Sequence, residues 1–183
     1  GGPGTPGLQW GVVFRLALTA DLAVNFGPTY GTWTLSGATW TPLHPLSPLA
    51  MVTGDLDGNG IDDLVVNFGP GIGVWTWMNH ASWALLHALS PSAMATGDID
   101  NNGHADVVLV FPGYGTWRWS DGTWSQLHPF DAAAVVIGQV DGVANADVIL
   151  DFPGYGVDRI LTKLAEASER GGGRMLFDHR ASR

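Results

Sequence analysis

Short apolar runs recur along this chain, and the same polar, glycine-rich segments separate them each time. Residues 54–77 contain an acidic loop, an apolar run and an alternating aromatic run, and residues 97–119 repeat this order. A weaker copy occupies 138–157, and residues 20–35 hold the back half of an earlier copy. The period is about 42 residues, and self-similarity at such a spacing indicates a repeat architecture.

Each copy predicts four short strands. The second strand is nearly continuous in apolar residues, which is typical of a strand buried on both faces. Gly-Pro, Pro-Gly and Asn-Gly pairs mark the joints between strands. The predicted strands are 50–55, 63–68, 73–77 and 82–87 in the second copy, 92–98, 106–111, 115–119 and 123–128 in the third, and 31–35, 39–44 and 147–152 in the outer copies.

Four strands in about 42 residues are the blade of a β-propeller, so we expect an all-β propeller with about four blades in this chain. A change in composition at Asp158 separates a tail, in which Leu161, Leu164 and Ala165 have helical spacing. The tail is either a docking helix or a loosely ordered appendage. The expected units are repeats at about 11–49, 50–91, 92–132 and 133–157, and the tail at 158–183.

The first and last copies are incomplete. Residues 13–21 stand where an acidic loop is expected, and the last copy stops at Asp158, where earlier copies have Trp. Because open strand edges invite pairing, we favour a homo-oligomer that completes a ring. A small closed ring and a fragment of a longer propeller are the alternatives.

An acidic loop opens each of the two central copies. Side-chain oxygens stand at positions 1, 3, 5 and 9, a backbone carbonyl is available at position 7, and Gly at position 6 permits a tight turn. Ca²⁺ binds six to eight oxygens at about 2.3–2.6 Å, so the spacing predicts Ca²⁺ in both loops. A metal-free turn rich in Asp and Asn is the alternative. The predicted ligands are Asp55, Asp57, Asn59, Ile61 and Asp63 in one loop and Asp98, Asp100, Asn102, His104 and Asp106 in the other.

The outer copies lose this spacing. The last one has Gln139 at position 1 and Val143 at position 5, which leaves Asp141 and Asp147, and the first copy keeps Asp21 alone. We therefore expect no metal in either. The intact loops also lack a Glu at position 12 and are flanked by predicted strands, so they are not EF-hands.

A loop of this kind followed by an apolar strand that ends in Phe-Gly resembles the FG-GAP (VCBS-type) repeats of integrin-α-like propellers. The resemblance covers about residues 20–157, with Phe26-Gly27 and Phe68-Gly69 as literal matches and Phe-Pro in the later copies. It implies a propeller with Ca²⁺ in the hairpin between the first two strands of a blade. The family includes adhesion modules, lectins and domains appended to enzymes, so the resemblance does not choose a function.

Aromatic residues and histidines also recur by repeat. The paired Trp residues of the third strand suit a core between blades, whereas Trp on the fourth strand is the better candidate for exposure. A His follows Leu in each fourth strand, as a hydrogen-bonding group within the blade or as a repeated ligand contact. The candidate ligand-binding residues are Trp40, Trp83, Trp124, His44, His87, His128, Tyr30 and Tyr114.

Composition narrows the function. Residues 1–157 contain 13 Asp, no Glu, and Arg15 and Arg118 as their basic residues, so this acidic body argues against nucleic acid as a partner. The sequence contains no run of about 18 apolar residues, so we expect no membrane insertion. The chain has no Cys, which leaves the compartment open, although we favour an extracellular one.

No nucleophile elbow, zinc-protease motif or phosphate loop is present in the sequence, so we expect no enzymatic activity. The first hypothesis is a Ca²⁺-stabilised propeller that binds carbohydrate through repeated shallow sites. The second is a structural or protein-interaction propeller that assembles into an oligomeric ring.

Overall fold

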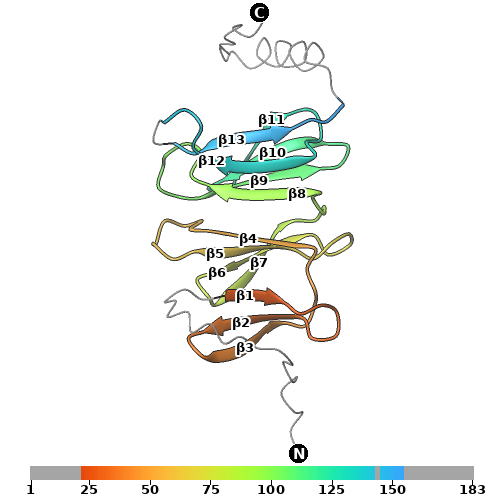
Figure 1. The fold of residues 1–183 in the computed structure, drawn as a ribbon, viewed down its shortest axis with the longest axis vertical. Helices are drawn as coiled ribbons and strands as arrows, with labels where there is room; N and C mark the ends of the chain where they lie inside the picture. Colours follow the sequence, from red (N-terminus) through yellow and green to blue (C-terminus); the bar gives the residue numbers. More distant parts are fainter. Residues whose placement is uncertain (1–21, 143–144, 155–183) are drawn as a thin grey trace, which may run out of the picture. The chain divides into compact units, whose positions relative to one another are not determined.

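The computed structural model describes residues 22–142 and 145–154. These residues form strands, turns and bends with no helix, so the described fold is all-β (Figure 1). None of the described segments is a helix of the length and apolar character that would cross a bilayer. The predictions for residues 13–21, Val143 and the tail 158–183 fall outside the described residues. The chain divides into two compact units, Gly1–Ser47 and Pro48–Arg183, which we describe separately.

All described sheets are antiparallel. The first unit has one sheet with the order β1-β2-β3, formed by β1 (Leu22–Asn25), β2 (Thr32–Ser36) and β3 (Thr39–His44). The second unit has two four-stranded sheets in chain order and a two-stranded one. Its strands are β4 (Ala50–Gly54), β5 (Asp63–Asn67), β6 (Val74–Met78) and β7 (Ser82–His87), then β8 (Ala93–Gly97), β9 (Asp106–Phe111), β10 (Gly115–Ser120) and β11 (Thr123–His128), and finally β12 (Ala134–Gly138) and β13 (Asp147–Asp151).

The two complete sheets confirm the four-stranded repeat, and every strand predicted by range is present within one or two residues. The three larger sheets share an irregularity between their last two strands, at Thr32/Trp33, Val74/Trp75 and Thr116/Trp117. A β-bulge increases local twist and re-aims the following side chains. The repeat therefore extends to backbone detail.

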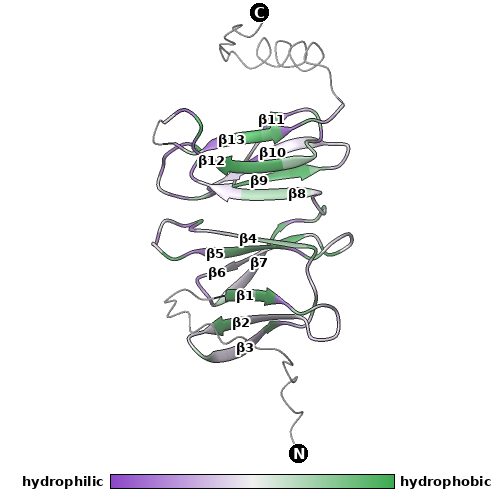
Figure 2. Ribbon diagram, viewed as in Figure 1, coloured by the Kyte–Doolittle hydropathy of each residue, from purple (hydrophilic) through white to green (hydrophobic). Residues whose placement is uncertain are grey.

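The core of the second unit lies around β5 and β9, whose residues are all buried. Val65, Val107 and Leu109 are fully buried and belong to one apolar cluster. Figure 2 shows hydrophobic residues concentrated in these strands and hydrophilic ones in the connecting loops. The prediction of a strand buried on both faces is thus confirmed for β5 and β9.

The same prediction is wrong for β13, where Ile149 is 41% exposed. Within the described residues β13 pairs with β12 alone, so its sheet lacks the flanking strand that covers β5 and β9. Burial of a second strand therefore depends on its neighbours as well as on its own apolar sequence.

Neighbouring sheets of the second unit approach closely where their first strands meet, β4 against β8 and β8 against β12. A Cβ placed on Gly54 would lie 2.7 Å from the Cβ of Ala105, and one placed on Gly97 would lie 2.5 Å from Cγ2 of Ile137. These distances leave no space for a side chain. Glycine at the end of the first strand thus permits the sheets to pack.

Backbone hydrogen bonds link the acidic loops of successive sheets. The amide of Ala105 donates to the carbonyl of Asp55 at 2.7 Å, and the amide of Ala146 donates to the carbonyl of Asp98 at 3.0 Å. In each case position 8 of one loop binds position 1 of the loop before it. Thr96 Oγ1 adds a hydrogen bond to the carbonyl of Thr53.

The Gly-rich turn after the second strand is held in two ways. In the sheet β4–β7, Asn67 Oδ1 accepts hydrogen bonds from the Gly69 amide and the Ser90 hydroxyl. Asn25 and Ser47 make the same arrangement in the first unit. In the sheet β8–β11 these two positions are Val110 and Asp131.

Asp131 takes over the role of the asparagine from the opposite side of the turn. Its carboxylate accepts hydrogen bonds from the amides of Gly113 at 2.7 Å and Gly115 at 2.9 Å. The side chain of Val110 is fully buried and has no atom that could accept a hydrogen bond. In the sheet β4–β7 the acceptor for the turn is thus Asn67 on the strand, and in the sheet β8–β11 it is Asp131 in the loop. The turn is hydrogen-bonded in both sheets.

We expect Asp131→Ser to lower the free energy of unfolding by about 1–3 kcal/mol, because two turn amides lose a charged acceptor. The added change Val110→Asn, which restores the pair seen in the other sheets, should recover much of that loss. Urea denaturation of the single and double variants measures both effects. A double variant that is less stable than Asp131→Ser would contradict this interpretation.

Candidate metal and ligand sites

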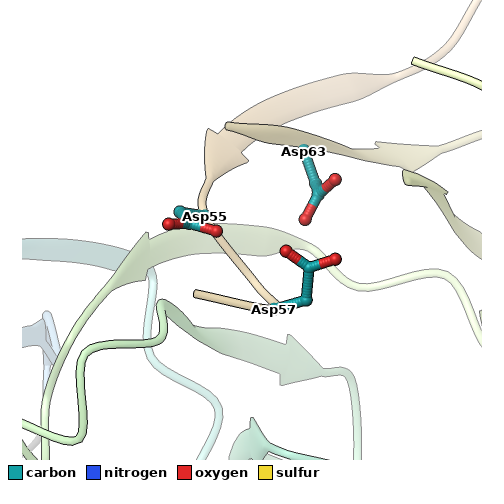
Figure 3. A group of neighbouring side chains, drawn as sticks. All are labelled: Asp55, Asp57 and Asp63. Carbon is teal, nitrogen blue, oxygen red and sulfur yellow. The ribbon is translucent and has the colours of Figure 1, made fainter. Parts of the chain in front are cut away.

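The loop 55–63 connects β4 to β5 and gathers three carboxylates. Asp55, Asp57 and Asp63 each offer an oxygen, and these oxygens lie within 4.8 Å of one another. Figure 3 shows the side chains of Asp57 and Asp63 directed into the space beside Asp55. Asp63 is 1% exposed because it opens the buried strand β5, whereas Asp57 faces solvent.

Backbone amides hold the loop in this conformation. Both oxygens of Asp55 accept hydrogen bonds, from the amides of Asn59 at 3.0 Å and Gly60 at 2.7 Å. Asn59 Oδ1 accepts from the amide of Ile61 at 2.7 Å. These bonds are the turn that Asp and Asn favour by themselves, and they leave lone pairs free on the same oxygens.

A residue outside the loop joins the cluster from the hairpin between β6 and β7. Asn79, at a φ of 53°, donates its amide to Asp63 Oδ1 at 2.7 Å and its side-chain nitrogen to Asp57 Oδ2 at 2.8 Å. Its side-chain oxygen accepts from Asn59 Nδ2. The left-handed backbone of Asn79 is one that Asn tolerates better than most residues.

The loop 98–106, between β8 and β9, repeats this arrangement. Oxygens of Asp98, Asp100 and Asp106 lie within 4.8 Å of one another, and Asp106 is fully buried. The Asp98 carboxylate accepts from the amides of Asn102 and Gly103 at 3.1 and 3.0 Å. The structure thus brings together the carboxylates predicted for each metal loop.

Arg118 on β10 distinguishes the second loop from the first. Its guanidinium donates to Asp106 Oδ1 at 3.0 Å and to Asp100 Oδ2. Burial by itself would lower the pKa of Arg118, but the hydrogen bonds and charges of Asp106 and Asp100 raise that pKa overall. Two of the three carboxylates in this loop therefore already have a cationic partner.

The two loops differ in how well they suit Ca²⁺. The atoms of Asp55, Asp57 and Asp63 that could bind a metal ion are all carboxylate oxygens. Among the described residues no Lys, Arg or His forms an ion pair with these carboxylates. That donor set fits a hard cation. The loop 98–106 has the same oxygens with a guanidinium among them.

The predicted position-7 residues have side chains directed elsewhere. Ile61 is 51% exposed, and His104 lies 2.7 Å from Asp121 Oδ1 through its Nδ1. The hydrogen bond to Asp121 raises the pKa of His104, and the charges of Asp121, Asp55 and Asp57 add to this rise against desolvation. The ligand expected at position 7 is the backbone carbonyl, and its contact with a metal ion stays a prediction.

The three repeated histidines make the predicted hydrogen bond within each blade. Nδ1 of His44, His87 and His128 accepts the amide of the residue two positions later, at 3.1 to 3.2 Å. Nε2 must then carry the ring proton. Burial lowers the pKa of all three rings below 6.5.

Two of these rings also pack on the phenylalanine of the next sheet. The ring centroids of His87 and Phe111 are 4.5 Å apart, and those of His128 and Phe152 are 4.4 Å apart. His128 is 3% exposed, which leaves its ring little surface for a ligand. His87 remains partly exposed beside a cleft.

This cleft lies between the sheets β4–β7 and β8–β11. It consists of two adjoining hollows of about 260 Å³ each, which share Leu89, Phe111 and Tyr114. The Trp124 ring packs against His87 at 5.2 Å and Phe111 at 6.0 Å. Predicted ligand residues His87, Tyr114 and Trp124 therefore meet in one place.

The remaining candidates do not line this cleft. Trp83 packs on Phe68 at a centroid distance of 5.8 Å in the sheet β4–β7. In the first unit Trp40 packs on Phe26 at 5.3 Å and is 44% exposed, and Tyr30 is 59% exposed. Ligand contact by any of these residues stays a prediction.

Sequence reasoning missed Arg118, Asn79 and Asp121. A signal for Arg118 was available, because it is a basic residue in an acidic body and stands where earlier copies have Thr34 and Thr76. Asn79 and Asp121 carry no such signal, since Asn and Asp are ordinary hairpin residues. Their contacts with the loops become apparent only from the folded hairpins.

The comparisons with known proteins concern the fold. No protein-family model matches the chain, and no curated protein sequence matches it. A similar solved structure is the crystal structure of BBS1N in complex with ARL6DN, soaked with mercury, with a TM-score of 0.51 and 12% identity. The match covers 73% of this chain and 47% of that one, so the chain spans about half the length of BBS1N. BBS1N is a β-propeller, and the described sheets are propeller-like.

Acidification should destabilise the protein through the three repeated histidines His44, His87 and His128. A lowered folded-state pKa means that the neutral rings contribute stability above pH 6.5, which is lost as the pH falls toward the folded-state pKa. His87→Asn keeps an acceptor for the Leu89 amide that does not titrate in this range. Melting temperature measured from pH 7.5 to 5 should then fall less steeply for the variant than for the wild type. Parallel profiles would contradict a contribution from His87.

Proposed function

We propose that this protein is a Ca²⁺-stabilised, propeller-like module that binds carbohydrate and has no catalytic activity. The observation that carries the proposal is the aromatic cleft between the sheets β4–β7 and β8–β11. Ligand sites are typically concave and mostly apolar with a few polar groups, and this cleft has that character.

The cleft suits a sugar ring because it combines flat apolar surfaces with polar groups. Tyr114 is 61% exposed and presents a ring and a hydroxyl, and Trp124 adds a second ring on the neighbouring strand β11. Ser90 and Pro70 line the adjoining hollow. The C–H face of a pyranose packs on such rings, and its hydroxyls need donors and acceptors nearby.

Calcium has a stabilising part in this proposal. The loop 55–63 holds a carboxylate at the first residue of the buried strand β5, and Asp57 and Asn59 are within the same turn. A cation bound there would offset the charge of Asp63 and tie the hairpin to the core. A ligand that binds only the folded state stabilises it by mass action.

A protein partner is the second candidate. The similar structure BBS1N was determined in complex with ARL6DN, which is a protein-bound state of that propeller. The described residues also leave sheets with fewer strands at β1–β3 and β12–β13, whose edges could pair with another chain. Self-association into a ring therefore stays part of this alternative.

Trp124→Ala should weaken glycan binding at least tenfold, which corresponds to about 1.4 kcal/mol, because a stacking surface is lost. Leu85→Ala is a matched control, since Leu85 is 53% exposed on β7 and does not line the cleft. A glycan array identifies the sugar, and titration calorimetry compares the variants. Absence of any glycan binding by folded protein would overturn the carbohydrate proposal and favour a protein partner.

Calcium should raise the melting temperature of the wild type by several degrees, and Asp57→Ala should abolish this rise. Asp57 faces solvent, so its loss removes a ligand with little change in packing. Differential scanning fluorimetry in CaCl₂ and in EDTA measures the shift, and native mass spectrometry counts bound ions and chains together. An equal shift in Asp57→Ala would place the ion elsewhere, and a monomeric mass would argue against a ring made by self-association.

A further inference from the structure

We propose that Arg118 is the built-in cation of the loop 98–106, and that this loop therefore does not take Ca²⁺ although its sequence matches the metal pattern. The inference rests on the proposed function of the loop 55–63 as a Ca²⁺ site. It goes beyond that proposal by assigning different chemistry to two loops that the repeat makes look equivalent.

Arg118 binds oxygens that a metal ion in this loop would need. A cation bound among Asp98, Asp100 and Asp106 would need an oxygen from each of them. The guanidinium already binds Asp106 Oδ1 at 3.0 Å and contacts Asp100 Oδ2. Arg118 therefore binds two of the three carboxylates that would form the metal site.

The sheet β4–β7 has a neutral residue where the sheet β8–β11 has Arg118. Thr76 occupies the position of Arg118 in the sheet β4–β7 and directs its hydroxyl to the carbonyl of Ala84. Asp63 Oδ1, the counterpart of the oxygen that Arg118 binds, accepts the neutral amide of Asn79 instead. One side chain thus decides whether a full positive charge stands in the cluster.

Arg118 and Asp106 form a largely buried ion pair. Asp106 is fully buried, and the Arg118 side chain is 18% exposed, so water screens their attraction poorly. An arginine cannot escape by losing its proton, because guanidinium stays charged in proteins. Ca²⁺ would have to displace a fixed charge from a buried carboxylate or sit beside it, and both are unfavourable.

The consequence is a division of roles between the two hairpins. The hairpin of the sheet β8–β11 has its buried charge compensated at every calcium concentration. The hairpin of the sheet β4–β7 depends on an ion from solution. The chain then has one calcium-dependent hairpin rather than two.

The test counts calcium ions on the full-length chain by native mass spectrometry and titration calorimetry, with CaCl₂ as the only added ligand. We expect one ion on the wild type and none on Asp57→Ala. Arg118→Thr, which installs the residue found at position 76, should bind two, and Asp57→Ala combined with Arg118→Thr should bind one. Arg118→Lys keeps the charge and serves as the matched control, so it should stay at one ion.

Several results would overturn the inference. Two ions on the wild type, or one ion retained by Asp57→Ala alone, would mean that the loop 98–106 binds calcium despite Arg118. A folded Arg118→Thr variant with one ion would mean that the arginine is not what excludes the second. If Arg118→Thr does not fold, the count on Asp57→Ala still decides, because that variant retains Arg118. No ion on folded wild type would defeat the proposed calcium site itself, and the inference with it.

Discussion

The two four-stranded sheets of the second unit depend on a carboxylate buried at the first residue of an apolar strand. Asp63 and Asp106 each end an exposed loop and begin a strand whose remaining residues are buried. A buried charge is costly unless it is hydrogen-bonded and paired. Both carboxylates bind an amide from the start of their own loop, Leu56 or Ile99, which closes the turn and satisfies one oxygen. The other oxygen, Oδ1, needs a partner from further along the chain. Asp63 Oδ1 accepts the neutral amide of Asn79, whereas Asp106 Oδ1 accepts the charged guanidinium of Arg118.

Most of the fold could be predicted because its signals are local. Apolar runs such as Asp106–Phe111 and the glycines between them define strands without reference to distant residues. The clustering of carboxylates in the acidic loops could also be predicted, because Asp98, Asp100 and Asp106 lie within nine residues of one another. The partial exposure of β13 could not be predicted from its apolar sequence. It arises because, among the described residues, no strand flanks β13 on its second side.

Arg118 could not be assigned from spacing, since it approaches Asp106 across the β9–β10 ladder, where it is paired with Val108. A repeat alignment shows that a threonine has become an arginine, but it does not show which side chains that arginine reaches. The substitution at Val110 and Asp131 is of the same kind, because each change is intelligible only beside its partner. Sequence repeats therefore predict positions better than they predict the interactions made at those positions.

The hydrogen bonds from Ala105 to Asp55 and from Ala146 to Asp98 give the second unit a direction. The hairpins β4–β5 and β8–β9 each provide a carbonyl to the sheet after it, and among the described residues no backbone hydrogen bond runs back from that sheet to the same loop. Stability in such arrays is approximately a sum of unit terms and nearest-neighbour interfaces. Loss of order in one sheet would therefore weaken the next sheet through the contacts between them, of which this hydrogen bond is one, and opening of the unit would pass from sheet to sheet.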